Sequence, residues 1–157
     1  MVEISVKEDV TLISFHDSPA NMDMISLIFR RIAQAGIDVD MISQTPPNGQ
    51  HSSLSFTVDD GDFGGILQIS AELREINPDL KISVSSGNCK ISVMDPEMNG
   101  LPGYAAKVFS AASKVHTDIR MITTSESDIS LLVVKADLQS ALQAIKSSLH
   151  TGIRELQ

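Results

Sequence analysis

The sequence predicts an α+β protein made of two βαββαβ modules placed side by side. The first observation is an internal repeat, because residues 29–42 align without gaps on residues 109–122. The two segments share four identical pairs, Phe29/Phe109, Asp38/Asp118, Met41/Met121 and Ile42/Ile122. The second observation is that β-rich segments and segments with helical spacing of apolar residues follow one another in the same order in both halves. Repetition at a fixed spacing indicates a duplicated structural unit.

The first module is predicted at residues 10–86. It opens with a β-rich strand at residues 10–15, which ends at a predicted turn at residues 16–19 that contains Asp17 and Pro19. Apolar residues then recur at helical spacing as far as Ile32. Gly36 is expected to stop this helix, because glycine is common just beyond helix ends.

A hairpin, a second helix and a fourth strand complete the first module. These elements are predicted as a strand at residues 39–44, a turn at 46–49, a strand at 53–58, a helix that carries residues 66–73 and a strand at 81–85. Leu54, Phe56 and Val58 alternate along the third strand, which places them on one face. Asp62 is expected to cap the second helix with its side chain.

The second module is predicted at residues 1–9 plus 87–157. Its elements are a strand at residues 90–94, a turn at Pro102-Gly103, a helix at 104–115, strands at 119–123 and 129–134, and a helix at 138–149. Residues 151–157 are a poor candidate for a core strand, so the module is one strand short. Residues 3–6 resemble the strand at 81–84, and the N-terminal strand is therefore predicted to complete the second module. The alternative, in which residues 151–157 supply the missing strand, stays open.

Composition excludes several classes of protein. The net charge is -8 and only 12 residues are Lys or Arg, whereas proteins that bind nucleic acid neutralise phosphates with clustered basic residues. A single cysteine, Cys89, allows no internal disulfide and no multi-cysteine metal site, which favours a reducing compartment and a cytoplasmic protein. No apolar run approaches the roughly 20 residues that cross a bilayer, so no membrane association is expected.

Two segments resemble the regulatory half of aspartate kinases, which is a tandem pair of ACT domains. They are residues 36–44, GIDVDMISQ, and residues 121–130, MITTSESDIS, and they occur in the right order and separation. Residues 55–58 and Pro102-Gly103 also fit. The resemblance implies two ferredoxin-like βαββαβ modules, one inserted into the other, and feedback binding of lysine or threonine at the module interface.

The resemblance also implies a functional class. A homodimer formed through ACT modules is expected, together with a regulatory role in amino-acid biosynthesis that includes action in trans on an aspartate kinase catalytic subunit. No counterpart of the kinase half is found in these residues, so the chain is not expected to be an enzyme. The alternative is a structural partner of a metabolic enzyme with a degenerate ligand pocket.

An amino-acid effector has a carboxylate and an ammonium that both lose water on binding, so each needs a partner. Gly103, after Pro102, lies at a predicted helix N-terminus, where free N–H groups and the helix dipole favour a carboxylate. The other candidate effector residues are Asp17, Asp38, Val39, Gln44, Asp118, Ile119, Ser125 and Glu126. An ordinary turn also explains Pro102-Gly103, Asp38, Asp118, Ser125 and Glu126, and that alternative stays open.

Departures from the family pattern affect the expected ligand. The first module has Ala20 where the family has glycine before the helix, which puts its pocket in doubt. Arg120 occupies a position that is acidic in lysine-sensing relatives, and a cation there would repel a lysine side chain. A threonine-like effector is therefore favoured over lysine. The four histidines lack metal-ligand spacing, and no metal or cofactor is expected.

Overall fold

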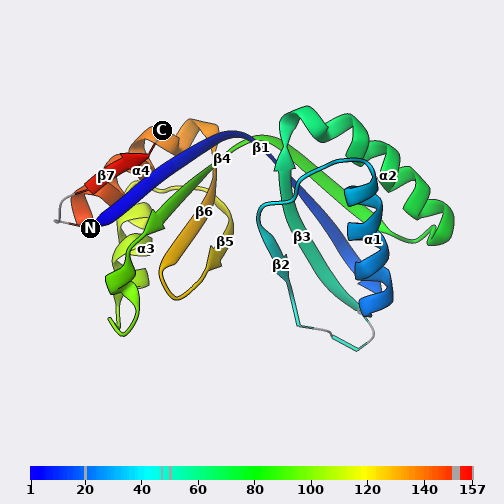
Figure 1. The fold of residues 1–157 in the computed structure, drawn as a ribbon, viewed down its shortest axis with the longest axis horizontal. Helices are drawn as coiled ribbons and strands as arrows, with labels where there is room; N and C mark the ends of the chain where they lie inside the picture. The colour runs from blue at the N-terminus through cyan, green and yellow to red at the C-terminus, as the bar shows by residue number, and fades with distance from the viewer. Residues whose placement is uncertain (20, 47, 50, 150–152, 157) are drawn as a thin grey trace. The chain divides into compact units, whose positions relative to one another are not determined.

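The chain forms two compact units in the computed structural model, which describes residues 1–19, 21–46, 48–49, 51–149 and 153–156 (Figure 1). We call Asp9–Ser86 the inserted unit and Met1–Glu8 with Gly87–Gln157 the flanking unit. The strands β1 (Val2–Pro19) and β4 (Lys81–Met94) each run through both units. Within the described ranges no helix is long and apolar enough to cross a membrane.

The inserted unit is a sheet in the order β2-β3-β1-β4 with two helices. Its own elements are α1 (Met22–Gln34), β2 (Ile42–Gln44), β3 (His51–Asp59), the 3-10 turn η1 (Asp60–Asp62) and α2 (Phe63–Ile76). β1 pairs antiparallel with β3, with Ile13 opposite Phe56. The alternating residues Leu54, Phe56 and Val58 all enter the core, as their spacing predicts, where they pack with residues of both helices such as Ile28 and Leu73.

Three sequence predictions for the inserted unit are wrong in detail. The backbone at residues 16–19 continues β1 instead of turning, with a register irregularity between Phe15 and Ser18. β2 is shorter than the predicted strand at residues 39–44. Asp62 makes no capping hydrogen bond, because η1 precedes α2 and holds Asp62 at φ -93° and ψ 3° instead of the extended conformation of a typical cap.

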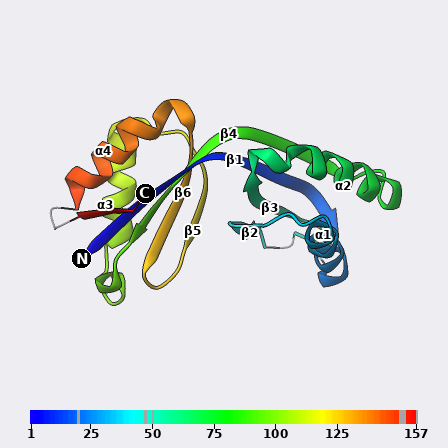
Figure 2. The same ribbon diagram turned by 45° about the horizontal axis from the view of Figure 1, so that its top comes forward.

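The flanking unit repeats this order of strands and helices. After β4 come the 3-10 turn η2 (Pro96–Met98), α3 (Tyr104–Lys114), β5 (Ile119–Thr124), β6 (Asp128–Val134), the 3-10 turn η3 (Lys135–Asp137), α4 (Leu138–Ser148) and β7 (Ile153–Leu156). The strand order is β1-β4-β6-β5, with β7 also paired to β1. Figure 2 shows α3 and α4 on the same side of these strands. The predicted α+β class with two ferredoxin-like βαββαβ modules is confirmed.

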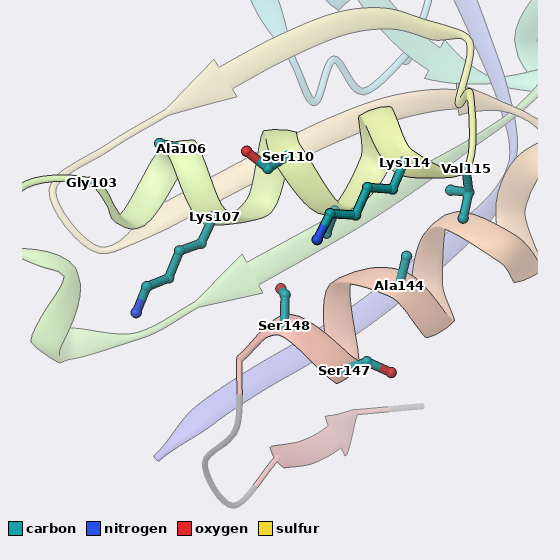
Figure 3. A pocket seen from close by; sticks show the side chains of 10 residues that line it. Gly103, Ala106, Lys107, Ser110, Lys114, Val115, Ala144, Ser147 and Ser148 are labelled. Atoms are coloured by element: carbon teal, nitrogen blue, oxygen red, sulfur yellow. The ribbon is translucent and has the colours of Figure 1, made fainter.

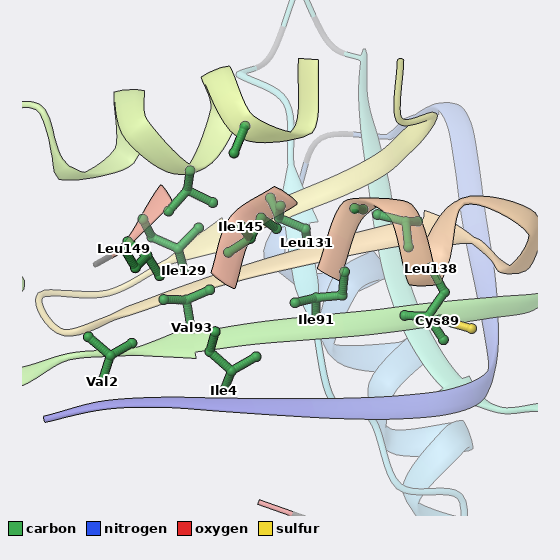
Figure 4. Packing of buried hydrophobic residues seen from close by; sticks show 14 residues of the cluster. Val2, Ile4, Cys89, Ile91, Val93, Ile129, Leu131, Leu138, Ile145 and Leu149 are labelled. Atoms are coloured by element: carbon green, nitrogen blue, oxygen red, sulfur yellow. The ribbon is translucent and has the colours of Figure 1, made fainter. Parts of the chain in front are cut away.

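The N-terminal part of β1 completes the flanking unit, as the strand count predicts. Val2 and Ile4 are buried in the same core cluster as Ile91, Leu131 and Ile145 (Figure 4). The C-terminal tail also forms a strand, although its sequence makes it a poor candidate for one. β7 runs parallel to residues 2–5 of β1, so it adds a strand beside β1 and does not replace it (Figures 1 and 2).

β1 and β4 both contain a residue in the left-handed region where they pass between units. These residues are Asp9, at φ 56°, and Gly87, at φ 74°. In β1 the core side chains are even-numbered in the flanking unit and odd-numbered in the inserted unit. In β4 they are odd-numbered in the flanking unit and even-numbered in the inserted unit. Because side chains alternate between the two faces of a strand, one extra residue moves all later odd-numbered side chains to the face that even-numbered ones occupied before it. The two left-handed residues therefore let each strand bury side chains in both cores.

Asn21 caps α1, and its removal should weaken the inserted unit. Its backbone is extended and its side-chain oxygen accepts a hydrogen bond from the Met24 N–H at 2.9 Å. Asn21→Ala leaves that donor without a partner and is expected to lower the free energy of unfolding by about 1 kcal/mol, whereas Asn21→Ser should cost less than about 0.5 kcal/mol. Urea denaturation of both variants measures the difference, and equal losses would show that the cap contributes nothing.

Candidate functional site

A pocket of about 330 Å³ lies in the flanking unit at the N-terminal end of α3. One wall is the segment that leads from η2 into α3, including Leu101, Gly103 and Tyr104. The other wall is the β5–β6 turn, including Ser125 and Glu126. The structure therefore brings together three sequence-predicted site residues, Gly103, Ser125 and Glu126, which come from two separate segments. The volume lies at the lower end of the range for small-molecule sites and suits a ligand of amino-acid size.

The first turn of α3 presents backbone donors to this pocket. Gly103 precedes the helix at φ 90°, a left-handed conformation that favours glycine, and an added side-chain carbon would meet no atom within 4 Å. The Tyr104 N–H donates to the Leu101 carbonyl at 3.4 Å. The next N–H groups of a helix have no partner within the helix, and the helix dipole adds partial positive charge there. This wall is suited to a carboxylate. Pro102 precedes Gly103 and is exposed.

The β5–β6 turn presents acceptors on the opposite wall. The turn closes through the Ser125 N–H, which donates to the Asp128 carbonyl at 2.9 Å. The Ser127 carbonyl accepts from the Asp95 N–H, also at 2.9 Å, which ties the turn to the end of β4. Ser125 and Glu126 are exposed within it. A carboxylate at Glu126 and a hydroxyl at Ser125 can accept hydrogen bonds from an ammonium group.

Two further polar residues at this site were missed by the sequence analysis. Asp95 is only 5% exposed, and its Oδ1 accepts from the Glu97 N–H at 3.0 Å. Burial raises the pKa of the Tyr104 phenol well above its usual value, and a side-chain hydrogen bond with Asp95 and the negative charges of Asp95 and Glu97 raise it further. This hydrogen bond is a weak one, because the Tyr104 hydroxyl has no partner of good hydrogen-bond geometry among the described residues. No spacing rule indicated this pair, because a loop separates its members.

The structure places Asp118 and Ile119 away from this pocket. They lie at the start of β5, whereas Ser125 follows the end of that strand. The Asp118 carboxylate is 3.4 Å from the Arg120 guanidinium, and its backbone N–H donates to Asp137 at 2.8 Å. Ile119 packs against the core of the flanking unit. In this unit these residues have structural partners and do not line the pocket with Gly103.

Asp38, Val39 and Gln44, the equivalent candidates of the inserted unit, do not line the pocket found in that unit. Asp38 is exposed, and Val39 packs against the core. The Gln44 side-chain amide donates to the Ser52 hydroxyl at 3.3 Å. Asp17 lies near the end of β1, and its side chain is outside the described part of the structure. Among the described residues of this unit, a pocket of about 200 Å³ lies between α1 and α2, where Arg31 and Glu72 approach to 3.6 Å.

A second, larger hollow of the flanking unit is the groove between α3 and α4, of about 690 Å³. Small side chains such as Ala106 and Ala144 line it together with Lys107 and Lys114 (Figure 3). None of the described residues that line it is acidic. Elsewhere, the described residues include no group of three or more His, Cys, Asp or Glu arranged to hold a metal ion.

This chain is similar to one protein-domain family and to several curated proteins. Residues 82–149 match the ACT domain family. An aspartokinase of Bacillus sp. (strain MGA3) is 25% identical over 142 residues, which are 90% of this chain and 34% of that protein. The chain thus spans about a third of the length of the curated relatives it matches.

Solved structures match over nearly the whole chain. A structure of aspartokinase alpha and beta subunits is 29% identical, with a TM-score of 0.84, and the match covers 95% of this chain and 98% of that one. The ligand-free regulatory subunit of aspartate kinase from Thermus thermophilus shares the fold at 23% identity and a TM-score of 0.84, covering 94% and 97%. The chain therefore resembles the tandem ACT regulatory region of aspartate kinases over almost its whole length, and its residues 82–149 match the ACT domain itself.

Proposed function

We propose that the chain is an allosteric sensor that binds a small amino acid and thereby controls an enzyme of amino-acid biosynthesis. The pocket that joins Gly103, Ser125 and Glu126 is the observation that carries the proposal. The N-terminal turn of α3 would bind the effector's carboxylate, and Glu126 would bind its ammonium. A zwitterion suits this pocket because its two charged groups need opposite partners, and the two walls offer them.

A threonine-like effector remains the proposed class, now because of the side chains that line the pocket. Arg120 does not line the pocket and lies next to Asp118, so its charge is not available there to repel a lysine side chain. The uncharged side chains of Thr124 and Ser125 line the pocket instead. They suit a short side chain with a hydroxyl, because an uncharged polar group can exchange hydrogen bonds with them.

The proposed mechanism is control of a separate catalytic subunit in the cytoplasm. An effector shifts a conformational equilibrium only by as much as its affinities for the two states differ. One solved aspartokinase that this chain resembles consists of alpha and beta subunits, so two kinds of chain occur in that relative. We propose a separate partner here as well, an aspartate kinase catalytic subunit, with a homodimer formed through the ACT modules. Asp38, Val39, Gln44, Asp118 and Ile119 would contribute to binding only where another module or copy completes a site.

A structural partner of a metabolic enzyme, with an empty effector pocket, is the second candidate. The groove between α3 and α4 favours it, because its small side chains and two lysines could receive an acidic segment of another protein. Thermal melting with a panel of amino acids separates the candidates. A ligand that binds only the folded state raises the melting temperature, so one amino acid should do so in the sensor. No change with any standard amino acid at millimolar concentration would favour the second candidate.

Glu126→Gln should weaken effector binding without unfolding the protein. The substitution keeps the side-chain shape but removes the charge that would hold the ammonium, and a hydrogen bond to a charged group contributes about 1.5–3 kcal/mol. The dissociation constant measured by calorimetry should therefore rise about tenfold or more. Glu97→Gln is the matched control, because it removes a carboxylate near the pocket that does not line it. Equal effects of the two variants would mean that only net charge matters and that Glu126 does not hold the ligand.

A further inference from the structure

The groove between α3 and α4 of the flanking unit is open, whereas an ion pair bridges the equivalent groove of the inserted unit. The gapless repeat makes Arg31 equivalent to Ala111, and alignment of the 3-10 turns η1 and η3 makes Glu72 equivalent to Ser147. In the inserted unit Arg31 and Glu72 approach to 3.6 Å, and the hollow measures about 200 Å³. In the flanking unit alanine and serine take these places, and the hollow measures about 690 Å³.

The open groove is positively charged. Lys107 and Lys114 extend from α3 on the side where α4 lies (Figure 3). Neither lysine forms an ion pair with another described residue, and none of the described residues that line the groove is acidic. The chain as a whole carries a net charge of -8, so this groove is a local exception. Its charge and its small side chains suit an acidic segment with protruding apolar side chains.

The exposed face of α2 has the complementary shape and charge. Phe63, Leu67 and Ala71 are spaced four residues apart, and side chains at this spacing form one ridge along a helix. Phe63 is 37% exposed and Leu67 is 48% exposed. Asp62 directly precedes this ridge and is the third aspartate within residues 59–62. The two large side chains fit a groove lined by alanine and serine, and the aspartates match its lysines.

We propose that the α3–α4 groove binds the α2 ridge, which consists of Phe63, Leu67 and Ala71, of a second copy of this chain. This contact would hold the copies together in the homodimer of the proposed function, on which the inference rests, and it does not involve the effector. Each copy carries one ridge and one groove. The contact therefore either occurs twice in a closed dimer or continues from copy to copy.

Exchanging the charges tests this contact. Lys107→Asp/Lys114→Asp sets aspartates against the aspartates of the ridge, so the dissociation constant for self-association, measured by sedimentation equilibrium, should rise about tenfold. Asp62→Lys should have a similar effect, because it sets a lysine against the lysines of the groove. An equimolar mixture of the two variants should associate about as tightly as the wild type, since every ridge can then meet a groove of opposite charge.

Arg30→Asp/Lys135→Asp is the matched control. It reverses two exposed cations that do not line the groove and should leave association close to that of the wild type. Wild-type association should also weaken as salt is added, a measurement that needs no variant. A wild-type protein that stays monomeric at submillimolar concentration, or a mixture that associates no better than either variant alone, would overturn this inference. The effector proposal would still stand if an amino acid raises the melting temperature.

Discussion

Replacing Ile4 with aspartate is expected to lower the free energy of unfolding of the flanking unit by about 5 kcal/mol. Ile4 is 1% exposed and packs in a core whose other strands come from the second half of the chain. The substitution removes a buried apolar side chain and places a carboxylate where the core cluster provides only apolar neighbours. This result would support the proposed division into modules at residues 10–86 and at residues 1–9 plus 87–157.

Hydrogen exchange measured residue by residue is the test for Ile4→Asp. Backbone amides of β4 and β6, such as those of Ile91 and Leu131, should lose protection, because their core loses its first strand. Glu8→Ala is the control, since Glu8 is exposed on the same strand and its replacement should change stability by less than about 0.5 kcal/mol. Unchanged protection in β4 and β6 would show that the N-terminal strand is dispensable.

Phe56→Ala should be the most damaging single change in the inserted unit, at about 4 kcal/mol. The ring is fully buried and lies 5.9 Å from the Phe15 ring and 5.4 Å from the Phe29 ring, measured between centroids. Removing it leaves a cavity and ends two aromatic contacts, each of which contributes about 0.5–1.5 kcal/mol beyond burial. Denaturant unfolding monitored by circular dichroism measures the loss.

The control for Phe56→Ala is Phe63→Ala, because Phe63 is 37% exposed at the start of α2 and should cost much less. Amino-acid binding in the flanking pocket provides a second readout. Every described residue that lines that pocket belongs to the flanking unit, so binding should persist in both phenylalanine variants at temperatures where the variant remains folded. A loss near 1 kcal/mol in Phe56→Ala would mean that the core collapses around the missing ring.

Local sequence signals predicted most of the fold. Apolar residues that alternate at Leu54, Phe56 and Val58 can share only one face of a strand, and the structure buries all three. The internal repeat predicted that Met41 and Met121 occupy equivalent places, and both are buried just before or within the second strand of their units. The strand missing from the second half predicted the role of Val2 and Ile4, because a βαββαβ unit needs four strands.

The predictions failed where the surrounding structure, nearby or distant in sequence, overrides the preference of a residue type. Asp62 is a good capping residue by type, but the η1 turn fixes its backbone in another conformation. Residues 16–19 have the composition of a turn, yet Ser18 and Pro19 pair with Ser52 and His51 of β3. Pairing with β3 keeps this segment in the sheet, a preference that no local pattern reveals.

The candidate pocket, too, was predictable from the sequence only in part. Gly103, Ser125 and Glu126 stand out in the sequence because their types and their places at element ends are those of ligand-binding residues. These residues meet in one pocket because of how α3 and the β5–β6 turn pack onto one sheet. The same packing separates Asp118 from the pocket and places the Tyr104 hydroxyl near Asp95. Residue type and spacing specify which groups are available, whereas long-range packing specifies which of them share a cavity.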